Sequence, residues 1–443
     1  MKFKPIKRYC FEGNIKYFGS NEDVLIPEKY EEKKEELRGV WVSTVANIDV
    51  PRMKEVNVEE IEKYKKYLDS IIETVKKYHM NTVVFQVRPV GDALYESELN
   101  PWSAVLTGVE GKYPGFDVFK YFCDIAEKNN VKVHAWINPY RAGRVDIVKE
   151  GISKQEFIDT LDEKNFARRH PECTVLTNKN LLSLDPSSKE VMEFVSDSVL
   201  EIAKKYNVKA VHIDDYFYPY EGINDPDEEK KAEERGFENL GDFRRDNVNK
   251  LIEMISDKLK TLDKKVEFGI SPFGIYRTKA SNFKVEEKPE SAWEFGSNNS
   301  SACTTCYKGL YADVYLWMKN GWIDYVVPQD YWDLDNTTLD EEGNEKCLVR
   351  YADIADWWND ICGKTGVKLY IGQAIYRYSN NGNWANPYEV PNQMLYNQTL
   401  KNVDGTVFFT YHNFTDENNE VLVKGRELLL ELWTKDVLIN RIL

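Results

Sequence analysis

Asn207-Val-Lys-Ala-Val-His-Ile-Asp-Asp-Tyr-Phe-Tyr-Pro219 is the stretch that decides the fold and the candidate site. An apolar run through Val211 and Ile213 gives way to two adjacent carboxylates, three aromatic residues and a proline. A buried parallel strand that ends in an active site has this form, because it is apolar along its length and polar at its carboxyl end. Side chains alternate along a strand, so Val211 and Ile213 share one face while His212 and Asp214 share the other. We therefore expect His212 and Asp214 to point into the interior of a sheet or barrel.

The carboxylates of this stretch admit two interpretations. A buried carboxylate needs hydrogen-bonding partners or a function, so a structural ion pair that caps the strand is the simpler one. The neighbouring Tyr216, Phe217 and Tyr218 favour the other, because aromatic rings beside a carboxylate suit a sugar-binding cleft.

Strand-like and helix-like segments alternate from residue 37 onward. The strand-like runs are Arg38–Val45, Thr82–Arg88, Val131–Ile137, Val208–Asp214, Lys265–Pro272, Ile323–Gln329, Lys368–Gln373 and Thr406–Tyr411. Helical periodicity falls between or after them, at 57–78, 115–129, 186–206, 237–262, 308–320, 350–363, 391–402 and 420–434. This count predicts a (β/α)8 TIM barrel, an α/β fold. An open doubly wound sheet is the alternative, although it rarely needs eight regular units.

The chain divides into two parts on this reading. Residues 1–36 are rich in charge and predict a short N-terminal extension, formed by a strand pair and a solvated linker. Residues 37–443 predict the barrel.

Loop length is distributed unevenly between the two ends of the predicted barrel. The helix-to-strand connections are short, whereas the strand-to-helix connections are long, at 138–185, 215–236, 273–307, 330–349 and 374–390. Barrel enzymes carry their active sites at the end that holds the strand-to-helix loops. These loops contain Trp293, Tyr307, Trp332, Tyr376, Tyr378 and Trp384. The sequence therefore predicts a groove with aromatic walls at that end.

Polar residues stand at or near the ends of several predicted strands. They are Gln86 and Arg88, then His134, Trp136 and Asn138, then Gln329, Asp330, Tyr331 and Trp332, and finally Gln373 with Tyr376 and Arg377 beyond it. A single Gln or Arg at a strand end is ordinarily structural. A whole set that converges on Asp214 predicts a hydrogen-bonding cage for a hydroxyl-rich ligand.

Composition and motifs exclude several other classes of function. The chain of 443 residues has a formal net charge of −15, which disfavours nucleic-acid binding through a general basic surface. Cys303-Thr-Thr-Cys306 is the only metal-like spacing among seven cysteines and has no second pair, so we expect no metal site, although a local disulfide there stays open. The chain has no apolar run of about 18 residues, so we expect no transmembrane segment.

The sequence also lacks the signatures of several catalytic chemistries. It has no Gly-x-Ser-x-Gly elbow, no phosphate loop, no His-x-x-x-His spacing and no dinucleotide-binding glycine pattern. We therefore expect no cofactor. Carboxylate chemistry remains, and glycoside hydrolysis is its foremost example.

Seven motifs occur in a fixed order along the chain. They are Arg38-Gly-Val-Trp-Val-Ser43, Gln86-Val-Arg-Pro-Val-Gly-Asp-Ala-Leu-Tyr-Glu-Ser97, His134-Ala-Trp-Ile-Asn-Pro-Tyr-Arg141, Leu184-Asp-Pro186, His212-Ile-Asp-Asp-Tyr-Phe-Tyr-Pro219, Phe268-Gly-Ile-Ser-Pro-Phe-Gly-Ile-Tyr-Arg277 and Asp324-Tyr-Val-Val-Pro-Gln-Asp-Tyr-Trp332. Together they resemble the glycosyl-hydrolase-like family 10 lipoproteins, a bacterial group that includes a divisome-localised peptidoglycan glycosidase. The resemblance extends from about residue 37 to residue 412.

This resemblance implies a TIM barrel related to the α-amylase-like hydrolases and a polysaccharide substrate, most plausibly the glycan strand of peptidoglycan without its stem peptides. His212-Ile213-Asp214 is similar to the triplet that ends in the nucleophilic Asp of that wider group, so the resemblance and the alternation both indicate Asp214. The family motifs add five residues to the predicted substrate-binding set: Tyr140, Arg141, Tyr216, Tyr218 and Arg277. His212 belongs to the same set.

A second carboxylate is harder to place. The Glu that closes the fifth strand in α-amylase-like enzymes is missing, because Gly269-Ile-Ser-Pro272 offers only Ser271. Asp92 is the first candidate, since a Gly-Asp-Ala turn would hold it, and we expect it to face one cavity with Asp214. Asp215, expected to face away from Asp214 as a supporting partner unless the strand has already turned there, is second, and Asp330 is third.

Alternatives to this function remain. A glycan-binding barrel with weak or no turnover would share the aromatic residues and the hydroxyl cage, and another polysaccharide could be the substrate. The resemblance implies a location in the cell envelope or outside the cell, whereas the chain shows no export signal or lipobox, which leaves a cytoplasmic location open. The sequence makes no prediction of oligomeric state.

Overall fold

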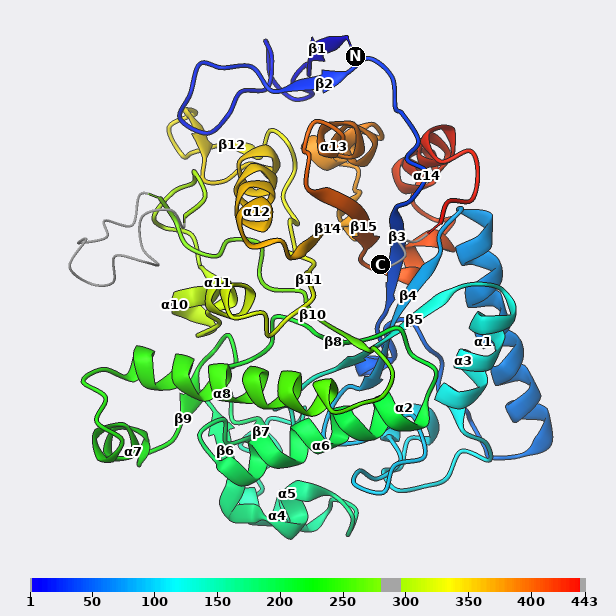
Figure 1. Cartoon of the computed structure of the whole chain (residues 1–443), viewed down its shortest axis with the longest axis vertical. Coiled ribbons are helices and arrows are strands. Elements are labelled where there is room, and N and C mark those ends of the chain that lie inside the picture. The colour runs from blue at the N-terminus through cyan, green and yellow to red at the C-terminus, as the bar shows by residue number, and fades with distance from the viewer. Residues whose placement is uncertain (1, 280–295, 439–443) are drawn as a thin grey trace.

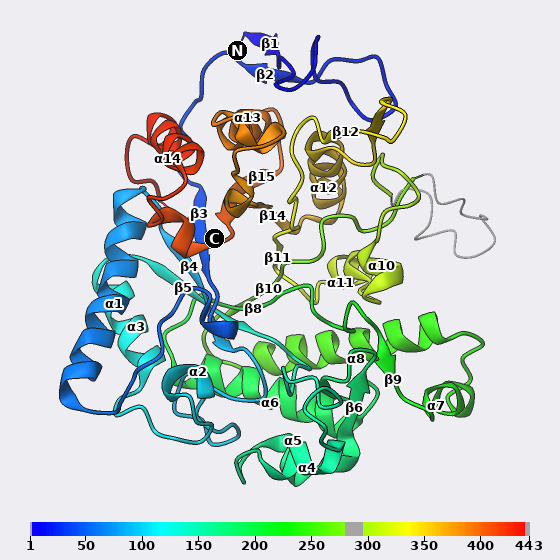
Figure 2. The same ribbon diagram turned by 180° about the vertical axis from the view of Figure 1, so that it is seen from behind.

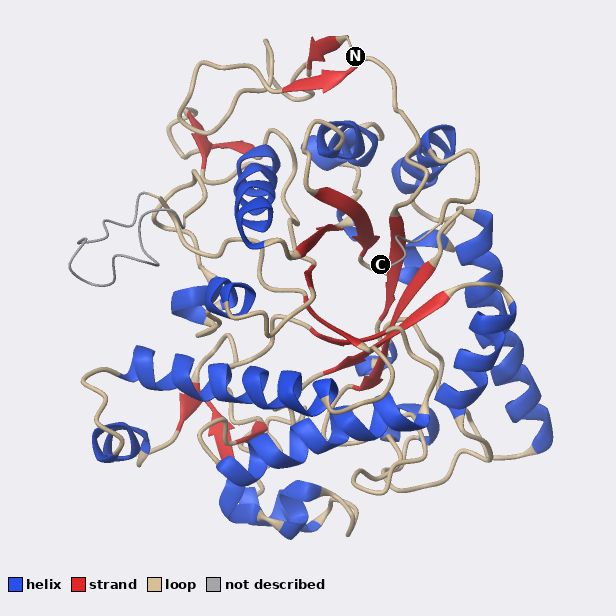
Figure 3. Cartoon of the chain, viewed as in Figure 1, coloured by secondary structure: helices blue, strands red, loops and turns tan. Residues whose placement is uncertain are grey.

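Eight parallel strands form a closed barrel at the centre of the molecule, as the computed structural model shows for residues 2–279 and 296–438 (Figures 1 and 3). In chain order they are β3 (Leu37–Val42), β4 (Thr82–Arg88), β5 (Lys132–Ile137), β8 (Ala210–Ile213), β10 (Glu267–Ile270), β11 (Tyr325–Val326), β14 (Lys368–Gln373) and β15 (Val403–Phe408). Each strand pairs with its predecessor and its successor, and β15 closes the ring on β3. The (β/α)8 prediction is confirmed.

Helices surround the barrel, which Figure 2 shows from behind. The main ones are α1 (Val58–Lys77), α3 (Val118–Lys128), α6 (Lys189–Lys205), α8 (Leu240–Lys260), α11 (Val314–Lys319), α12 (Tyr351–Thr365), α13 (Glu389–Asn397) and α14 (Glu420–Leu432). In α1 the side chain of Asn57 caps the first turn by accepting from the Glu60 N–H, and one face of the helix is buried.

One predicted helix is interrupted. The periodicity of residues 308–320 predicts a continuous helix, whereas the structure has α10 (Cys306–Gly309) and α11. Tyr311, between them, takes a left-handed backbone conformation with φ of 57°. The Asp313 side chain then caps α11 by accepting from the Leu316 N–H, so a new helix begins there.

The strand-to-helix loops contain short helices and strands. They are the helices α2 (Ala104–Thr107), α4 (Lys154–Asp159), α5 (Phe166–Arg169) and α7 (Glu228–Glu234), the hairpin β12–β13 (Thr337–Leu339 and Glu345–Cys347), and a small sheet of β6 (Thr174–Thr177), β7 (Leu182–Leu184) and β9 (Ile223–Asn224). The long loops thus gather at the carboxyl ends of the barrel strands.

The N-terminal residues pack against the barrel domain (Figure 1). β1 (Phe3–Pro5) pairs with β2 (Leu25–Pro27) in an antiparallel manner. Ile15 and Val24 are buried in the main hydrophobic core. Arg8 donates to Asp335 over 3.0 Å, which ties this segment to the loop after β11.

The barrel interior holds a chain of hydrogen bonds. The Tyr325 hydroxyl contacts His134 Nδ1 at 2.8 Å and His212 Nδ1 at 3.1 Å, and His212 Nε2 contacts the Ser271 hydroxyl at 2.9 Å. The Tyr325 ring occupies the space beside Gly269, where a Cβ would lie 1.9 Å from the ring. Glycine is therefore required at this position for the tyrosine to cross the barrel.

Two predictions from composition concern cysteines and membranes. All seven cysteines are free, so Cys303 and Cys306 do not form the disulfide that the sequence left open. Within residues 2–279 and 296–438, no helix combines the length and the apolar character that a membrane span requires.

Candidate active site

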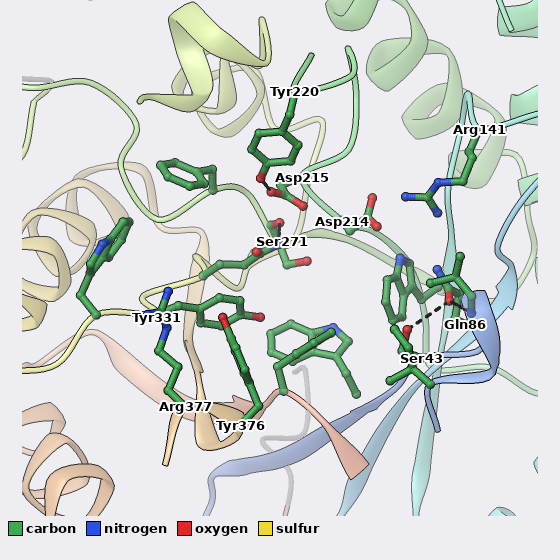
Figure 4. Close-up of a pocket in the computed structure, with 18 residues that line it drawn as sticks. Ser43, Gln86, Arg141, Asp214, Asp215, Tyr220, Ser271, Tyr331, Tyr376 and Arg377 are labelled. Carbon is green, nitrogen blue, oxygen red and sulfur yellow. Dashed lines mark hydrogen bonds between the residues drawn. The ribbon is translucent and has the colours of Figure 1, made fainter. Parts of the chain in front are cut away.

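A cavity of about 550 Å³ lies at the carboxyl ends of the barrel strands (Figure 4). All eight strands contribute to it. The lining residues are Trp41, Ser43, Val45, Ile48, Gln86, Trp136, Arg141, Asp214, Asp215, Tyr220, Ser271, Phe273, Gln329, Tyr331, Trp332, Tyr376, Arg377 and Phe409.

Asp214 and Asp215 both line this cavity (Figure 4). Strand β8 ends at Ile213, so both residues follow the last residue of the strand, and the chain bends at Asp215. The expectation that Asp215 faces away from Asp214 holds only for a continuing strand, and it is not met here. Two adjacent carboxyl groups therefore share one side of the cavity.

Asp214 is held by donors from the chain around it. Its carboxylate accepts from the Tyr216 N–H at 3.2 Å and lies 3.5 Å from Asn138 Nδ2. The positive charge of Arg141 acts on it as well. Burial raises the pKa of Asp214, whereas Arg141 and the donors oppose this and favour the charged form.

The position of Arg141 follows from the turn after β5. Its N–H donates to Asn138 Oδ1 at 2.9 Å, and its Nη1 donates to the Pro89 carbonyl at 2.9 Å. The guanidinium also lies 4.5 Å from the centre of the Tyr216 ring. Three contacts thus fix this cation beside Asp214.

Asp215 has the opposite electrostatic environment. The Tyr220 hydroxyl donates to its carboxylate. Burial, together with the charge of Asp214, raises the pKa of Asp215 to about 7. Since the charge of Asp214 helps to raise the pKa of Asp215, Asp214 ionises first, and Asp215 retains a proton for much of the time at neutral pH. This is the division between a base or nucleophile and a general acid.

Gln86 presents a hydrogen-bond donor to the cavity. Its Oε1 accepts from the N–H groups of Thr44 at 2.9 Å and Val45 at 2.8 Å, which fixes the orientation of the amide. Its Nε2 is buried and has no partner among the described residues. An unpaired buried donor on a cavity wall suits an acceptor oxygen on a ligand.

Aromatic rings form another part of the wall. Tyr331, Tyr376 and Phe409 lie mutually within 6.0 Å of one another, centre to centre, and Trp41 lies 6.0 Å from Phe409. We call Trp41, Tyr331, Tyr376 and Phe409 the aromatic wall. Faces and edges of such rings pack against the C–H groups of sugars.

The structure brings together ten of the residues that the sequence singled out. They are Gln86, Trp136, Arg141, Asp214, Asp215, Gln329, Tyr331, Trp332, Tyr376 and Arg377. Asn138 and Tyr216 do not line the cavity but contact Asp214 and Arg141.

Asp92 lies outside the cavity lining, which corrects the expectation that it faces Asp214 there. It is buried, and the Ser103 hydroxyl donates to its carboxylate at 2.6 Å. Burial raises the pKa of Asp92 to about 6. The turn does hold this residue, but against the start of α2.

Asp330 is also outside the lining. Gln329 takes the position that faces the cavity, so alternation sends the next side chain elsewhere. Neither carboxyl oxygen of Asp330 has a hydrogen-bond partner in the described ranges, and burial raises its pKa well above the ordinary value. Asp330 is thus a buried acid whose surroundings favour its neutral form.

Arg88 leaves the interior face of β4 because the pairing register shifts between Gln86 and Arg88. Gln86 pairs with the interior Trp136, whereas Arg88 pairs with the outward-facing Ile137. Its guanidinium donates to Asn100 Oδ1 at 3.0 Å and to the Asn138 carbonyl at 2.6 Å. Arg88 therefore supports the loop after β5 and does not line the cavity.

The two interior histidines do not supply positive charge to Asp214. Burial lowers the pKa of His134 to about 3, and it lowers the pKa of His212 well below the ordinary value. Both are neutral members of the barrel core. Arg141 is the residue whose positive charge acts on Asp214.

Four further predicted residues pack away from the cavity. Tyr140 is buried, Tyr218 accepts from Asn247, Arg277 lies over the Tyr307 ring at 3.7 Å, and Gln373 donates to Tyr351. Trp293 lies outside the described residues.

Sequence reasoning did not assign Trp41, Ser43, Val45, Ile48, Tyr220, Ser271, Phe273 or Phe409 to the site. Alternation along the first and last predicted strands could have found Ser43 and Phe409. The contact from Tyr220 depends on the course of the loop after β8, for which the sequence carries no comparable signal.

Comparison with known proteins identifies the family. The model of the family described as glycosyl hydrolase-like 10 matches residues 36–389. The chain belongs to this family. It is 36% identical over 411 residues to "Glycosyl hydrolase YngK" of Bacillus subtilis strain 168, covering 91% of this chain and 73% of the relative. It is 30% identical over 403 residues to "Glycosyl hydrolase DigH" of Escherichia coli strain K12, covering 86% and 84% respectively. The family member described here is a glycosidase.

Solved structures share the fold. The catalytic domain of a β-amylase from Paenibacillus polymyxa has a TM-score of 0.51 at 10% identity, covering 90% of this chain and 99% of that one. The glycoside hydrolase domain of PgaB (BpsB) from Bordetella bronchiseptica has a TM-score of 0.50 at 11% identity, again covering 90% and 99%. At such identities the likeness concerns the barrel alone.

Proposed function

We propose that this glycosidase hydrolyses the glycan strands of peptidoglycan from which the stem peptides have been removed. The observation that carries the chemistry is two adjacent carboxyl groups on one cavity wall, of which Asp214 is acted on by the charge of Arg141 and Asp215 has its pKa raised to about 7 by burial and by the charge of Asp214. Asp215 protonates the glycosidic oxygen, and Asp214 stabilises the positive charge that develops at the anomeric carbon. The aromatic wall and Gln86 hold the sugar rings between them.

Arg377 supports an acidic glycan as the substrate. It lies in the short helix Ile375–Arg377 after β14, is exposed, and forms no ion pair with any described residue. Removal of a stem peptide exposes the lactyl carboxylate of muramic acid, whereas an attached peptide converts it to a neutral amide. A free cation at the cavity therefore favours the peptide-free strand.

The motif resemblance to a group that includes a peptidoglycan glycosidase supports the same substrate. This substrate would place the enzyme in the cell envelope.

Mass spectrometry of reaction products tests the proposal. Peptide-free glycan strands should yield soluble oligosaccharides, and intact peptidoglycan should yield far less. Absence of soluble products from the peptide-free strands would contradict the proposal.

The variant Arg377→Gln tests the substrate assignment. We expect it to raise the KM for peptide-free strands with little change in kcat, because a distant charge contact contributes uniform binding. Lys401→Gln is the matched control, since Lys401 is exposed just before β15 begins, at the opposite end of the barrel. An unchanged KM in Arg377→Gln would remove the lactyl contact from the account.

A further inference from the structure

We propose that the nucleophile is the 2-acetamido group of the substrate itself, positioned by Asp214 while Asp215 serves as acid and base. This inference rests on the proposed function, because it requires an N-acetylated sugar at the scissile bond. It names what attacks the anomeric carbon, which the proposed function leaves open.

The placement of the two carboxylates is the first observation. A mechanism that uses two protein carboxylates needs them on opposite sides of the anomeric carbon, about 5–5.5 Å apart for retention or about 6.5–9.5 Å apart for inversion. Asp214 and Asp215 are consecutive residues on one turn after β8 and lie on the same side of the cavity (Figure 4).

The facing side of the cavity is the second observation. Among the described lining residues, Asp214 and Asp215 are the only carboxylates. Figure 4 places Tyr331, Tyr376 and Arg377 across the cavity from the pair. Asp92 and Asp330, the other acids near strand ends, pack outside the lining. The described structure therefore offers no protein carboxylate to attack from the facing side.

The aromatic wall suits the acetamido group, which takes the place of a second protein carboxylate as the nucleophile. An acetamido group combines a methyl, which packs against aromatic rings, with an N–H that needs an acceptor and a carbonyl oxygen that can attack. Trp41, Tyr331 and Phe409 offer the apolar surface. Asp214, whose charged form the neighbouring Arg141 favours, offers the acceptor.

The bonds made and broken balance as follows. The acetamido carbonyl oxygen forms a bond to the anomeric carbon, while the bond from that carbon to the glycosidic oxygen breaks and its electron pair goes to the leaving oxygen. Asp215 gives its proton to that oxygen. The resulting oxazolinium ion carries a positive charge, which the Asp214 carboxylate offsets through the ring N–H.

Water completes the cycle. It attacks the anomeric carbon and gives a proton to the Asp215 carboxylate, and the electron pair of the carbon–oxygen bond returns to the acetamido carbonyl. One water is consumed, the anomeric configuration is retained, and both Asp residues regain their starting states.

Removal of the acetyl groups tests the inference. Peptide-free strands and the same strands after chemical de-N-acetylation should be compared for kcat/KM, with NMR of the first-formed anomer. We expect a loss of at least about 100-fold on de-N-acetylation, the lower range for one positioned catalytic group. We also expect retention, and competitive inhibition by the thiazoline of N-acetylglucosamine, which mimics the oxazolinium ion.

The outcomes separate the inference from the function on which it rests. Equal turnover of both strands, an inverted anomer, or a covalent adduct of a 2-deoxy-2-fluoro glycoside on Asp214 would overturn the inference and leave a glycosidase. No turnover of either strand would overturn both. The control for de-N-acetylation is re-acetylation of the treated strands, which should restore turnover.

Discussion

Two polar clusters inside the same barrel have opposite character. In the deeper one, His134, His212, Tyr325 and Ser271 form a continuous chain, and both ring nitrogens of His212 have partners. In the cavity, Asp214 and Asp215 place two carboxyl groups side by side, so that the charge of one raises the pKa of the other, and the Gln86 amide nitrogen has no partner among the described residues. Buried polar groups with hydrogen-bond partners stabilise a fold, whereas buried polar groups without partners on a cavity wall are available to bind a ligand. We infer that the deeper cluster is structural and the cluster in the cavity is functional.

The largest effect on activity is expected from a substitution in the cavity cluster. Asp214→Asn should lower kcat on peptide-free strands by about 10³-fold or more, which corresponds to about 4 kcal/mol of activation free energy. Its midpoint of thermal unfolding should be unchanged or raised, since the substitution removes like-charge repulsion from Asp215. Near-full activity would remove Asp214 from the mechanism, and circular dichroism would show that the fold is intact.

Substitution in the deeper cluster should lower stability and leave activity nearly unchanged. Tyr325→Phe leaves two histidine nitrogens without their partner, and we expect it to lower the free energy of unfolding by about 1–3 kcal/mol. The value of kcat should change little.

Tyr370→Phe is the matched control for this variant, because Tyr370 packs against Tyr325 in the same interior. The measurement is denaturant unfolding beside steady-state kinetics. A large loss of kcat with unchanged stability in Tyr325→Phe would show that the deeper cluster takes part in catalysis, and the comparison would fail.

The smallest effect concerns the rim of the cavity. Tyr376→Ala should weaken binding of glycan fragments by about 0.5–1.5 kcal/mol, the range for one aromatic contact. Tyr388→Ala is the control, since Tyr388 is also exposed but does not line the cavity. Equal affinity losses in the two variants, measured by calorimetry, would place the glycan elsewhere.

The sequence predicts the fold well because hydrophobic periodicity records each strand and helix directly. Thr82–Arg88 and Lys368–Gln373 coincide with β4 and β14. Alternation also places His212 inside the barrel and Asp214 at its rim. These inferences need only the local conformation of an extended strand.

The remainder of the site depends on departures from regular strands. A register shift in β4 turns Arg88 outward, and the end of β8 at Ile213 turns Asp215 inward. Asp92 follows a strand as predicted, but its loop folds back onto Ser103. Alternation assumes that a strand continues, so it misplaces residues just where the strand ends and catalysis begins.

We infer that Asp214 and Asp215 share one negative charge and one proton, with the charge on Asp214 and the proton on Asp215. The raised pKa of Asp215, about 7 against 3.8 for an ordinary Asp, has a consequence for stability with a definite sign. Between the ordinary pKa of 3.8 and about 7, Asp215 holds a proton in the native state that it has released in the unfolded state. The contribution of Asp215 to the free energy of unfolding is therefore fully present below pH 3.8 and is lost as the pH rises toward 7. Asp215→Asn should therefore unfold at a higher temperature than the native enzyme at alkaline pH.

The pH dependence of kcat/KM on peptide-free strands tests this claim most directly, because it reports the ionisations of the free enzyme. We predict that the rate falls as the pH rises through about 7, where Asp215 loses the proton that the leaving oxygen needs. The fall should shift to lower pH in Asp214→Asn, since the charge that raises the pKa of Asp215 is gone, and mass spectrometry of the products measures the residual rate on the same strands. A profile that stays flat far above pH 7, or one that Asp214→Asn leaves in place, would contradict the account.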